Sequence, residues 1–219
     1  MRLGFNGATT NTADLATDIR IAGEAGYDVV ELRDNKIEDF LAGGGSLADI
    51  RRMLDAAGVQ PWTINAISYV GVGGAEGDAK AVARCRQLSE YAQAIGCPWV
   101  LVVPGPNEDR SAEKILNDTA ATYAAMVDAA AEYGVGVAFE FMGFPWAAVR
   151  DVAGALKVVE QANRPKTGII IDTAHFHSGD STLESITSMD PSKLIVLHIN
   201  DLEAGIAKPD ILDGHRLYP

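Results

Sequence analysis

The amino-acid sequence predicts an α/β protein, a (β/α)8 barrel with parallel strands inside and helices outside. Three observations indicate this class. Apolar strand-like runs alternate with helical patterns along the 219 residues, as in parallel sheets covered by helices. Four helical segments end at a glycine, and an apolar run follows each time, after Gly26, Gly58, Gly96 and Gly134. The last three strand-like runs each end in a side chain that can bind a metal.

A doubly wound open sheet would show the same alternation. The barrel is favoured because its strands direct their C-terminal ends at one shared site, where ligands from successive strands can meet. A dinucleotide-binding sheet would also carry a G-x-G-x-x-G fingerprint after its first strand. The segment Gly4-Phe-Asn-Gly7 does not supply it.

The N-terminal half predicts three strands and three helices. Residues 2–6, 27–32 and 59–65 are short apolar runs of the kind that form strands, although Pro61 blurs the limits of the third. Apolar residues recur at helical spacing over residues 15–25, and Ser46 is placed to cap a helix that runs through Leu54. A long helix is expected over residues 78–95.

The C-terminal half continues the pattern. Strands are expected at residues 99–103, 135–141, 168–172 and 194–198, and helices at 111–133, 149–161 and near Leu183. A complete barrel usually takes about 250 residues. We therefore expect residues 1–219 to form one barrel domain that is shortened at its C-terminus and lacks the eighth strand and helix.

Composition and charge exclude several classes of partner. The 47% apolar and 22% charged residues are ordinary for a globular protein. A net charge of −12 repels phosphate backbones and anionic lipids, so neither nucleic acid nor membrane is expected as a partner. Cys85 and Cys97 form no disulfide framework, and the first residues lack a long apolar run, so no secretory leader is expected. These features indicate a cytoplasmic protein with reduced thiols.

The side chains that can bind a metal are Glu140, Asp172 and His198, which end the fifth, sixth and seventh strands. Each by itself is explained as a polar group at a strand end. Three ionisable groups that converge on one point need a shared reason, and one divalent cation supplies it. Two carboxylates and an imidazole suit Mn²⁺, Mg²⁺, Co²⁺ or Zn²⁺ without distinguishing among them.

Two further histidines follow Asp172. In an extended segment, His175 and His177 would lie on the same side, where either could reach the metal or a substrate oxygen. For His177, a solvated loop position explains the residue equally well. Asn200 and Asp201 are placed to orient the metal ligands.

The remaining candidates are polar residues of the last loop and two tryptophans. Asp213, His215 and Arg216 form a compact polar cluster, which a solvated loop would also explain. Trp62 and Trp146, near the ends of the third and fifth strands, could wall an apolar side of a pocket, although core packing is the commoner role of such residues.

Together these segments resemble the sugar phosphate isomerase/epimerase superfamily, the xylose isomerase-like TIM barrels, and most of all the inosose (2-keto-myo-inositol) isomerases. The resemblance covers essentially the whole chain. The segments that carry it are Phe139-Glu-Phe141, Ile171-Asp-Thr-Ala-His175, Leu197-His-Ile-Asn-Asp201 and the tail Asp213-Gly-His-Arg-Leu-Tyr-Pro219.

The resemblance implies that one divalent metal is bound by Glu140, Asp172, His198 and a second glutamate from the eighth strand, which has no counterpart here. It implies that His175 contacts substrate, and we expect Trp146 and Arg216 to do so as well. It also implies an isomerase or epimerase of a ketose or keto-cyclitol, as in inositol catabolism. Glu140 would remove the proton next to a metal-bound carbonyl, through an enediolate. Small-molecule binding and a homo-oligomer are compatible with this interpretation.

Two alternatives stay open at this point. Apurinic endonucleases of the same superfamily are metal-dependent phosphodiesterases, and Asp213 with His215 resembles their additional ligand pair. The acidic charge and the lack of a basic stripe argue against such an activity. A barrel that binds sugar without catalysis is the second alternative, and it depends on the absence of the eighth-strand glutamate.

Overall fold

The structure is a computed structural model that describes residues 1–179 and 181–219. Seven parallel strands form one sheet in sequence order, which is the order of a (β/α)8 barrel. They are β1 (Gly4–Asn6), β2 (Val29–Arg33), β3 (Gln60–Val70), β4 (Trp99–Pro104), β5 (Gly136–Glu140), β6 (Thr167–Asp172) and β7 (Leu194–His198). The fold class predicted from the sequence is confirmed.

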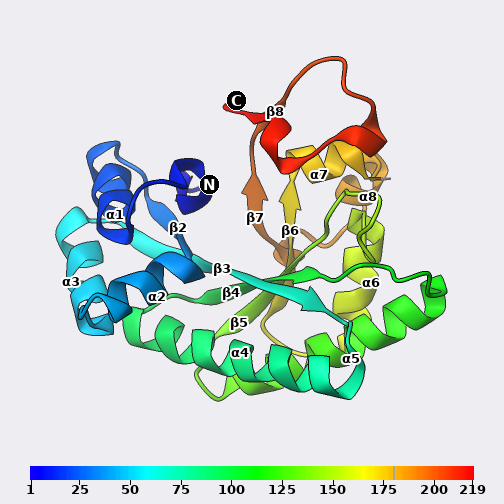
Figure 1. The fold of residues 1–219 in the computed structure, drawn as a ribbon, viewed down its shortest axis with the longest axis horizontal. Coiled ribbons are helices and arrows are strands. Elements are labelled where there is room, and N and C mark those ends of the chain that lie inside the picture. Colours follow the sequence, from blue (N-terminus) through cyan, green and yellow to red (C-terminus); the bar gives the residue numbers. More distant parts are fainter. Residues whose placement is uncertain (180) are drawn as a thin grey trace.

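The sheet curls, so that its last strand faces its first ones (Figure 1). His198 on β7 bonds to Glu31 on β2 and to Glu140 on β5. Near the other end of the strands, Trp62 Nε1 on β3 donates to the carbonyl oxygen of Ile195 on β7, at 3.2 Å. Within the described part of the chain, β1 and β7 are the two edges of the sheet and do not pair with each other.

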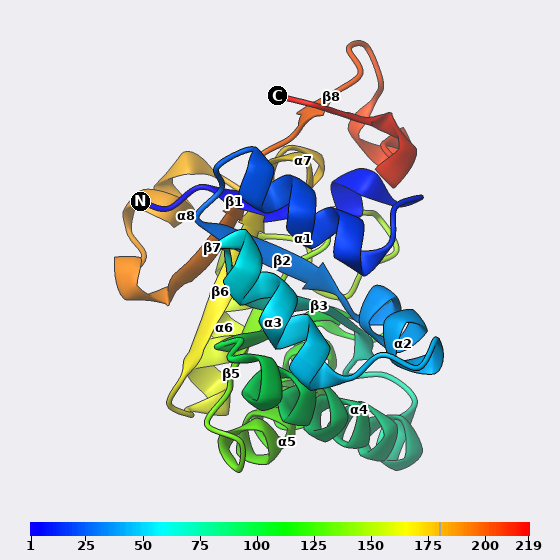
Figure 2. The same cartoon turned by 90° about the vertical axis from the view of Figure 1, so that its left-hand side faces the viewer.

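Helices cover the outer face of the curled sheet (Figures 1 and 2). They are α1 (Leu15–Glu24), α2 (Asp34–Ala42), α3 (Leu47–Ala57), α4 (Gly74–Ile95), α5 (Ala112–Ala131) and α6 (Val152–Ala162). Two short helices, α7 (Thr173–Ser178) and α8 (Leu183–Thr187), follow β6, and the antiparallel pair β8 (Asp201–Leu202) and β9 (Arg216–Leu217) lies beyond β7. Within the residues described, no helix is both long and apolar enough to cross a membrane.

Strand alternation divides the core into two parts. Outward side chains such as Val100, Phe139 and Ile169 pack with the helices in the large cluster. Leu101, Ala138 and Ile170 form a small separate cluster on the inner face. Because alternate residues share a face, the inner series of β5 continues from Ala138 to Glu140, and that of β6 from Ile170 to Asp172. The polar site therefore continues the inner apolar layer at the C-terminal ends of the strands.

The expected helix ends are present. Gly26, Gly58, Gly96 and Gly134 all have positive φ, between 68° and 78°, a conformation that glycine adopts without a steric penalty. Ser46 forms a full capping box with Asp49 at the start of α3. These local signals are why the helix–strand junctions were predictable.

Several boundaries differ from the sequence-based expectations. The strand expected at residues 59–65 continues to Val70, α4 begins four residues before Asp78, and α6 begins at Val152. The expectations contained no helix α2, whose N-cap residue Arg33 makes no side-chain cap bond. Tertiary contacts hold this helix instead, because Arg84 of α4 pairs with its Asp34, 2.8 Å away, and with its Glu38.

Candidate metal centre

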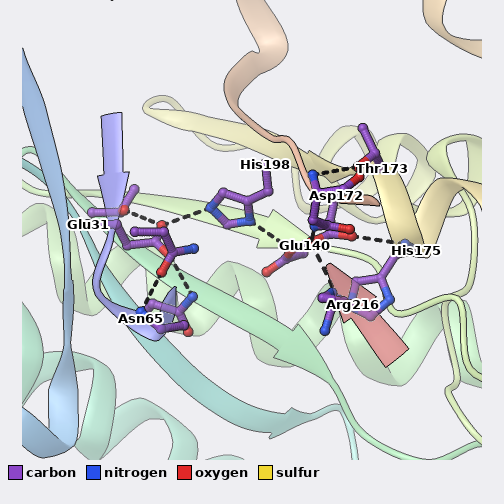
Figure 3. Close-up of polar contacts among 12 residues, drawn as sticks. Glu31, Asn65, Glu140, Asp172, Thr173, His175, His198 and Arg216 are labelled. Carbon is purple, nitrogen blue, oxygen red and sulfur yellow. Dashed lines mark hydrogen bonds and ion pairs between the residues drawn. The ribbon is translucent and has the colours of Figure 1, made fainter. Parts of the chain in front are cut away.

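Three strands bring Glu140, Asp172 and His198 together at the C-terminal edge of the sheet. Each residue offers one ligand atom, and the three atoms lie within 4.8 Å of one another. Strand register makes this convergence possible, since Asp172 is paired directly with His198 across β6 and β7. Both carboxylates are about 5% exposed. Figure 3 shows the three side chains around the inner face of the sheet.

His198 lies between two carboxylates (Figure 3). Its Nδ1 is 3.1 Å from Glu140 Oε1, and its Nε2 is 3.1 Å from Glu31 Oε2. Burial disfavours charge on the imidazole, but the two carboxylates outweigh burial and hold the pKa of His198 well above its ordinary value. The imidazole is thus the middle group of a row between the carboxylates of Glu31 and Glu140.

Asp172 is held by three neighbouring groups. It caps helix α7 by accepting from the His175 N–H at 3.0 Å, and it accepts from Asn200 Nδ2 at 2.8 Å. Arg216 Nη2 lies 3.4 Å away. Burial raises the pKa of the Asp172 carboxyl, but the positive charge of Arg216 and the bonds to His175 leave it below its usual value. Thr173 in turn fixes Asn200, because its hydroxyl donates to the Asn200 carbonyl at 2.7 Å.

His175 is buried, with 3% of its surface exposed. Arg216 Nη2 lies 3.0 Å from its Nε2, and because a guanidinium only donates, Nε2 accepts. The imidazole proton then lies on Nδ1, which has no partner among the described residues. Burial also lowers the pKa of His175, which favours this neutral form. An unpaired, buried N–H beside the metal ligands is suited to a substrate oxygen.

Arg216 is brought to the site by the small ribbon beyond β7. Antiparallel pairing of Leu202 with Arg216 sets its position in β9, and Asp213 forms an ion pair with its Nη1. The guanidinium therefore lies beside Asp172 and His175. Through Arg216, the last loop contributes to the site.

Trp146 does not contact His175 through a ring pair of its own but lies behind Phe144. Its ring stacks on Phe144, with centroids 5.7 Å apart, and Phe144 meets His175 edge-on at 4.9 Å. The Trp146 side chain is 45% exposed. The two aromatic rings thus form an apolar wall beside the imidazole of His175.

Four other candidates lie elsewhere. His177 is exposed, because the segment after Asp172 is helix α7 rather than extended chain, and residues two apart on a helix point about 200° apart. Trp62 lies near the start of β3, at the opposite end from the site, and carries the Arg2 guanidinium over its ring. Asp201 is exposed. His215 Nδ1 accepts from the Leu212 N–H. For His177 and Trp62, the alternatives outside the site therefore fit the structure.

Glu31 and Asn65 belong to the site, but the sequence reasoning did not select them. Glu31 accepts from Asn65 Nδ2 at 2.7 Å and from the Thr63 hydroxyl. A signal was present, since Val29-Val-Glu-Leu32 places a carboxylate inside an apolar strand. Its significance depends on curvature, which brings β2 opposite β7.

The residues present fit a divalent cation. Ligand atoms around a metal at about 2.0–2.2 Å are roughly 3–4 Å apart, and those of Glu140, Asp172 and His198 all lie within 4.8 Å of one another. Buried polar atoms surround them, and His175 Nδ1, Asn200 Oδ1 and Arg216 Nε have no partner in the described part of the chain. Such atoms are expected where a bound group completes the site.

Fold and site together define a TIM-barrel protein with a metal-type ligand set at the C-terminal ends of its strands. The chain belongs to the family of xylose isomerase-like TIM barrels, whose model matches residues 19–217. It is 30% identical to the inosose isomerase of Bacillus velezensis and 29% to that of Bacillus subtilis. Each alignment covers 93% of this chain and 73% or 74% of the relative. A crystal structure described as IOLI protein with a binding zinc atom matches with a TM-score of 0.94 at 28% identity, over all of this chain and 79% of that one.

Proposed function

We propose that the protein is a divalent-metal-dependent isomerase of a keto-cyclitol of the inosose type, an activity of inositol catabolism. The observation that carries the proposal is the convergence of Glu140, Asp172 and His198 beside the unpaired Nδ1–H of His175. The inosose isomerases and the zinc-bearing neighbour support the substrate class and the need for a metal.

Glu140, Asp172 and His198 would hold the cation. When bound, the cation would polarise the carbonyl and the adjacent hydroxyl of the substrate and so acidify the C–H bond between them. The donor set suits Zn²⁺, Mn²⁺, Co²⁺ and Mg²⁺. The zinc of the neighbouring structure makes Zn²⁺ the first metal to test.

Glu140 would also act as the base. Its carboxylate takes the proton from the carbon next to the carbonyl and returns it to the former carbonyl carbon, while a second proton moves from the hydroxyl oxygen to the carbonyl oxygen. The net result is an exchange of carbonyl and hydroxyl positions without an external oxidant. His175 would donate its Nδ1–H to a substrate oxygen, and Arg216 would keep that imidazole in the required tautomer.

Glu31 and Arg216 limit where the substrate can lie. Glu31 closes the side of the site beyond His198, and Arg216 covers Asp172. Trp146 and Phe144 offer an apolar wall next to His175, suited to the C–H face of a cyclitol ring. We place the substrate between this wall and Glu140.

The test is exchange of the inosose proton next to the carbonyl in deuterated water, followed by proton NMR with added Zn²⁺, Mn²⁺ or Co²⁺ and with a chelator. We expect exchange and isomer formation only with metal. Glu140→Gln should slow both by about 10²–10⁴-fold, the usual contribution of a general base. Glu160→Gln, on the exposed face of α6, is the matched control and should change neither rate. Wild-type exchange by Glu140→Gln would refute the role of Glu140, and cleavage of abasic DNA without inosose turnover would replace the proposed activity by the nuclease alternative.

A further inference from the structure

We propose that Glu31 is a positioning residue of the metal centre, which holds the His198 imidazole with its Nδ1 free to bind the cation. The inference rests on the metal site of the proposed function and adds a residue from β2, three strands away from the nearest ligand strand. Glu31 is 5% exposed, and its Oε2 lies 3.1 Å from His198 Nε2.

The two nitrogens of His198 face different groups. Nδ1 is directed at Glu140, on the side where the three ligand atoms gather, and Nε2 is directed at Glu31 on the other side (Figure 3). A histidine that binds a metal through one nitrogen carries its proton on the other, and the acceptor of that proton selects the tautomer. Glu31 is that acceptor, so it selects Nδ1 as the ligand atom.

Glu31 is itself fixed by groups that only donate toward it. Arg33 Nη1 donates to Asn65 Oδ1 at 2.8 Å, and because a guanidinium cannot accept, the amide of Asn65 has one allowed orientation. Asn65 Nδ2 therefore donates to Glu31 Oε1 at 2.7 Å. The Thr63 hydroxyl donates to Oε2, which also faces His198. The hydrogen-bond network Arg33–Asn65–Glu31–His198 therefore has a defined donor at each contact with Glu31.

Glu31 is not placed as a ligand. The metal-capable group in the described residues consists of Glu140, Asp172 and His198, and Glu31 lies beyond the imidazole from it. The structure therefore separates a binding role for Glu140 from an orienting role for Glu31, although both contact the same ring.

The hydrogen bonds around Glu31 determine what Glu31→Gln should do to metal binding. Asn65 still needs an acceptor, so the new amide at position 31 turns its oxygen toward Asn65 and its NH2 toward His198 Nε2. That donor stabilises the tautomer with its proton on Nδ1, which cannot bind the metal. Glu31→Gln should therefore weaken metal binding although it is nearly isosteric. Adding Asn65→Asp supplies a carboxylate to position 31, allows the amide oxygen to face His198, and should restore part of the affinity.

The experiment measures the Zn²⁺ dissociation constant by competition with a chromophoric chelator, and the visible spectrum of the Co²⁺ form. We expect about 10–100-fold weaker Zn²⁺ binding for Glu31→Gln and Glu31→Ala, the usual effect of removing a partner of a metal-binding histidine. We also expect an altered Co²⁺ spectrum and tighter binding by Glu31→Gln/Asn65→Asp than by Glu31→Gln. Asp18→Asn removes the charge of another buried carboxylate, which pairs with Lys36 rather than with a candidate metal ligand, and should lower the unfolding temperature without changing Zn²⁺ affinity.

The outcomes separate the two proposals. Wild-type Zn²⁺ affinity in Glu31→Gln, with an unchanged Co²⁺ spectrum, overturns the role of Glu31 whatever the activity. No rescue by Asn65→Asp overturns the tautomer argument. Tight metal binding by the wild type without turnover of inosose overturns the proposed function alone, and failure of the wild type to bind any of these metals overturns both.

Discussion

Lys36→Met should be among the most damaging single substitutions outside the site. Lys36 is 6% exposed, and its Nζ donates to Gly7 O at 2.9 Å, to Thr10 O at 2.8 Å and to Asp18 Oδ2 at 2.6 Å. The ammonium therefore joins α2 to α1 and to the turn after β1. Asp18 is 1% exposed, and among the described residues its carboxylate would keep only the hydroxyl of Thr10 as a side-chain partner.

The magnitude follows from the charge left behind. Removing one member of a buried ion pair costs about 3–5 kcal/mol, since the other charge stays desolvated. The whole free energy of unfolding of a domain is about 5–15 kcal/mol. At roughly 2–4 °C per kcal/mol for a chain of this size, the unfolding temperature should fall by about 6–20 °C.

Urea unfolding followed by far-UV circular dichroism measures this loss as a shift of the midpoint at constant slope. The double variant Lys36→Met/Asp18→Leu should recover most of it, because neither charge is then left unpaired. Lys80→Met removes an exposed partner of Glu76 on α4 and should have almost no effect. For a buried ion pair, Lys36→Met should lower the free energy of unfolding by about 3–5 kcal/mol. A decrease below about 1 kcal/mol would refute the conclusion that this ion pair stabilises the fold.

Three other predictions address the site and the thiols. A cation bound by the native state should raise the free energy of unfolding by about 2.7 kcal/mol at a hundredfold excess over its dissociation constant, and should raise the unfolding temperature reversibly. Calorimetry with Zn²⁺ and then EDTA tests this, and an unchanged melt would argue against the site. Arg216→Met should raise the KM for inosose about tenfold or more, with a smaller rise for Arg216→Lys, because the hydrogen bond to His175 Nε2 is lost; steady-state kinetics that match the wild type would exclude this role. Burial raises the pKa of the Cys85 thiol to about 11 and that of Cys97 to about 12, so the folded state keeps protons that the unfolded chain loses above about pH 9. Stability should therefore fall from pH 9 upward by about 1.4 kcal/mol per pH unit for each thiol, and Cys85→Ala/Cys97→Ala should flatten that slope in urea titrations at pH 8 to 10.5.

Local sequence determined most of the architecture. Apolar runs of Val and Ile define the strands, and four of the helices end next to glycines whose positive φ other residues rarely adopt. The residues of β5 to β7 that face the inside of the barrel were also predictable. Side chains alternate between the two faces of a strand, and the order of residues shows which polar residue ends each strand. This is why Glu140, Asp172 and His198 could be selected as a group before their geometry was known.

Other features depend on contacts between residues far apart in the chain. The carboxylate of Glu31 meets His198 only because the sheet curls, and curvature is a property of seven strands together. Helix α2 depends on Arg84 and Lys36 rather than on its own cap. His177 turned outward because the Asp172 carboxylate caps α7, a bond that converts an expected extended segment into a helix.

The amino-acid sequence therefore settled by itself where the seven strands of the sheet lie, which of their faces points inward and which candidate ligands end the last three, because these depend on interactions within a few residues. The partner of each candidate ligand, the tautomer of His175 and the position of Arg216 beside Asp172 were settled by the folded chain. They are consequences of curvature and of the position of the β8–β9 ribbon, and they join residues up to 167 positions apart.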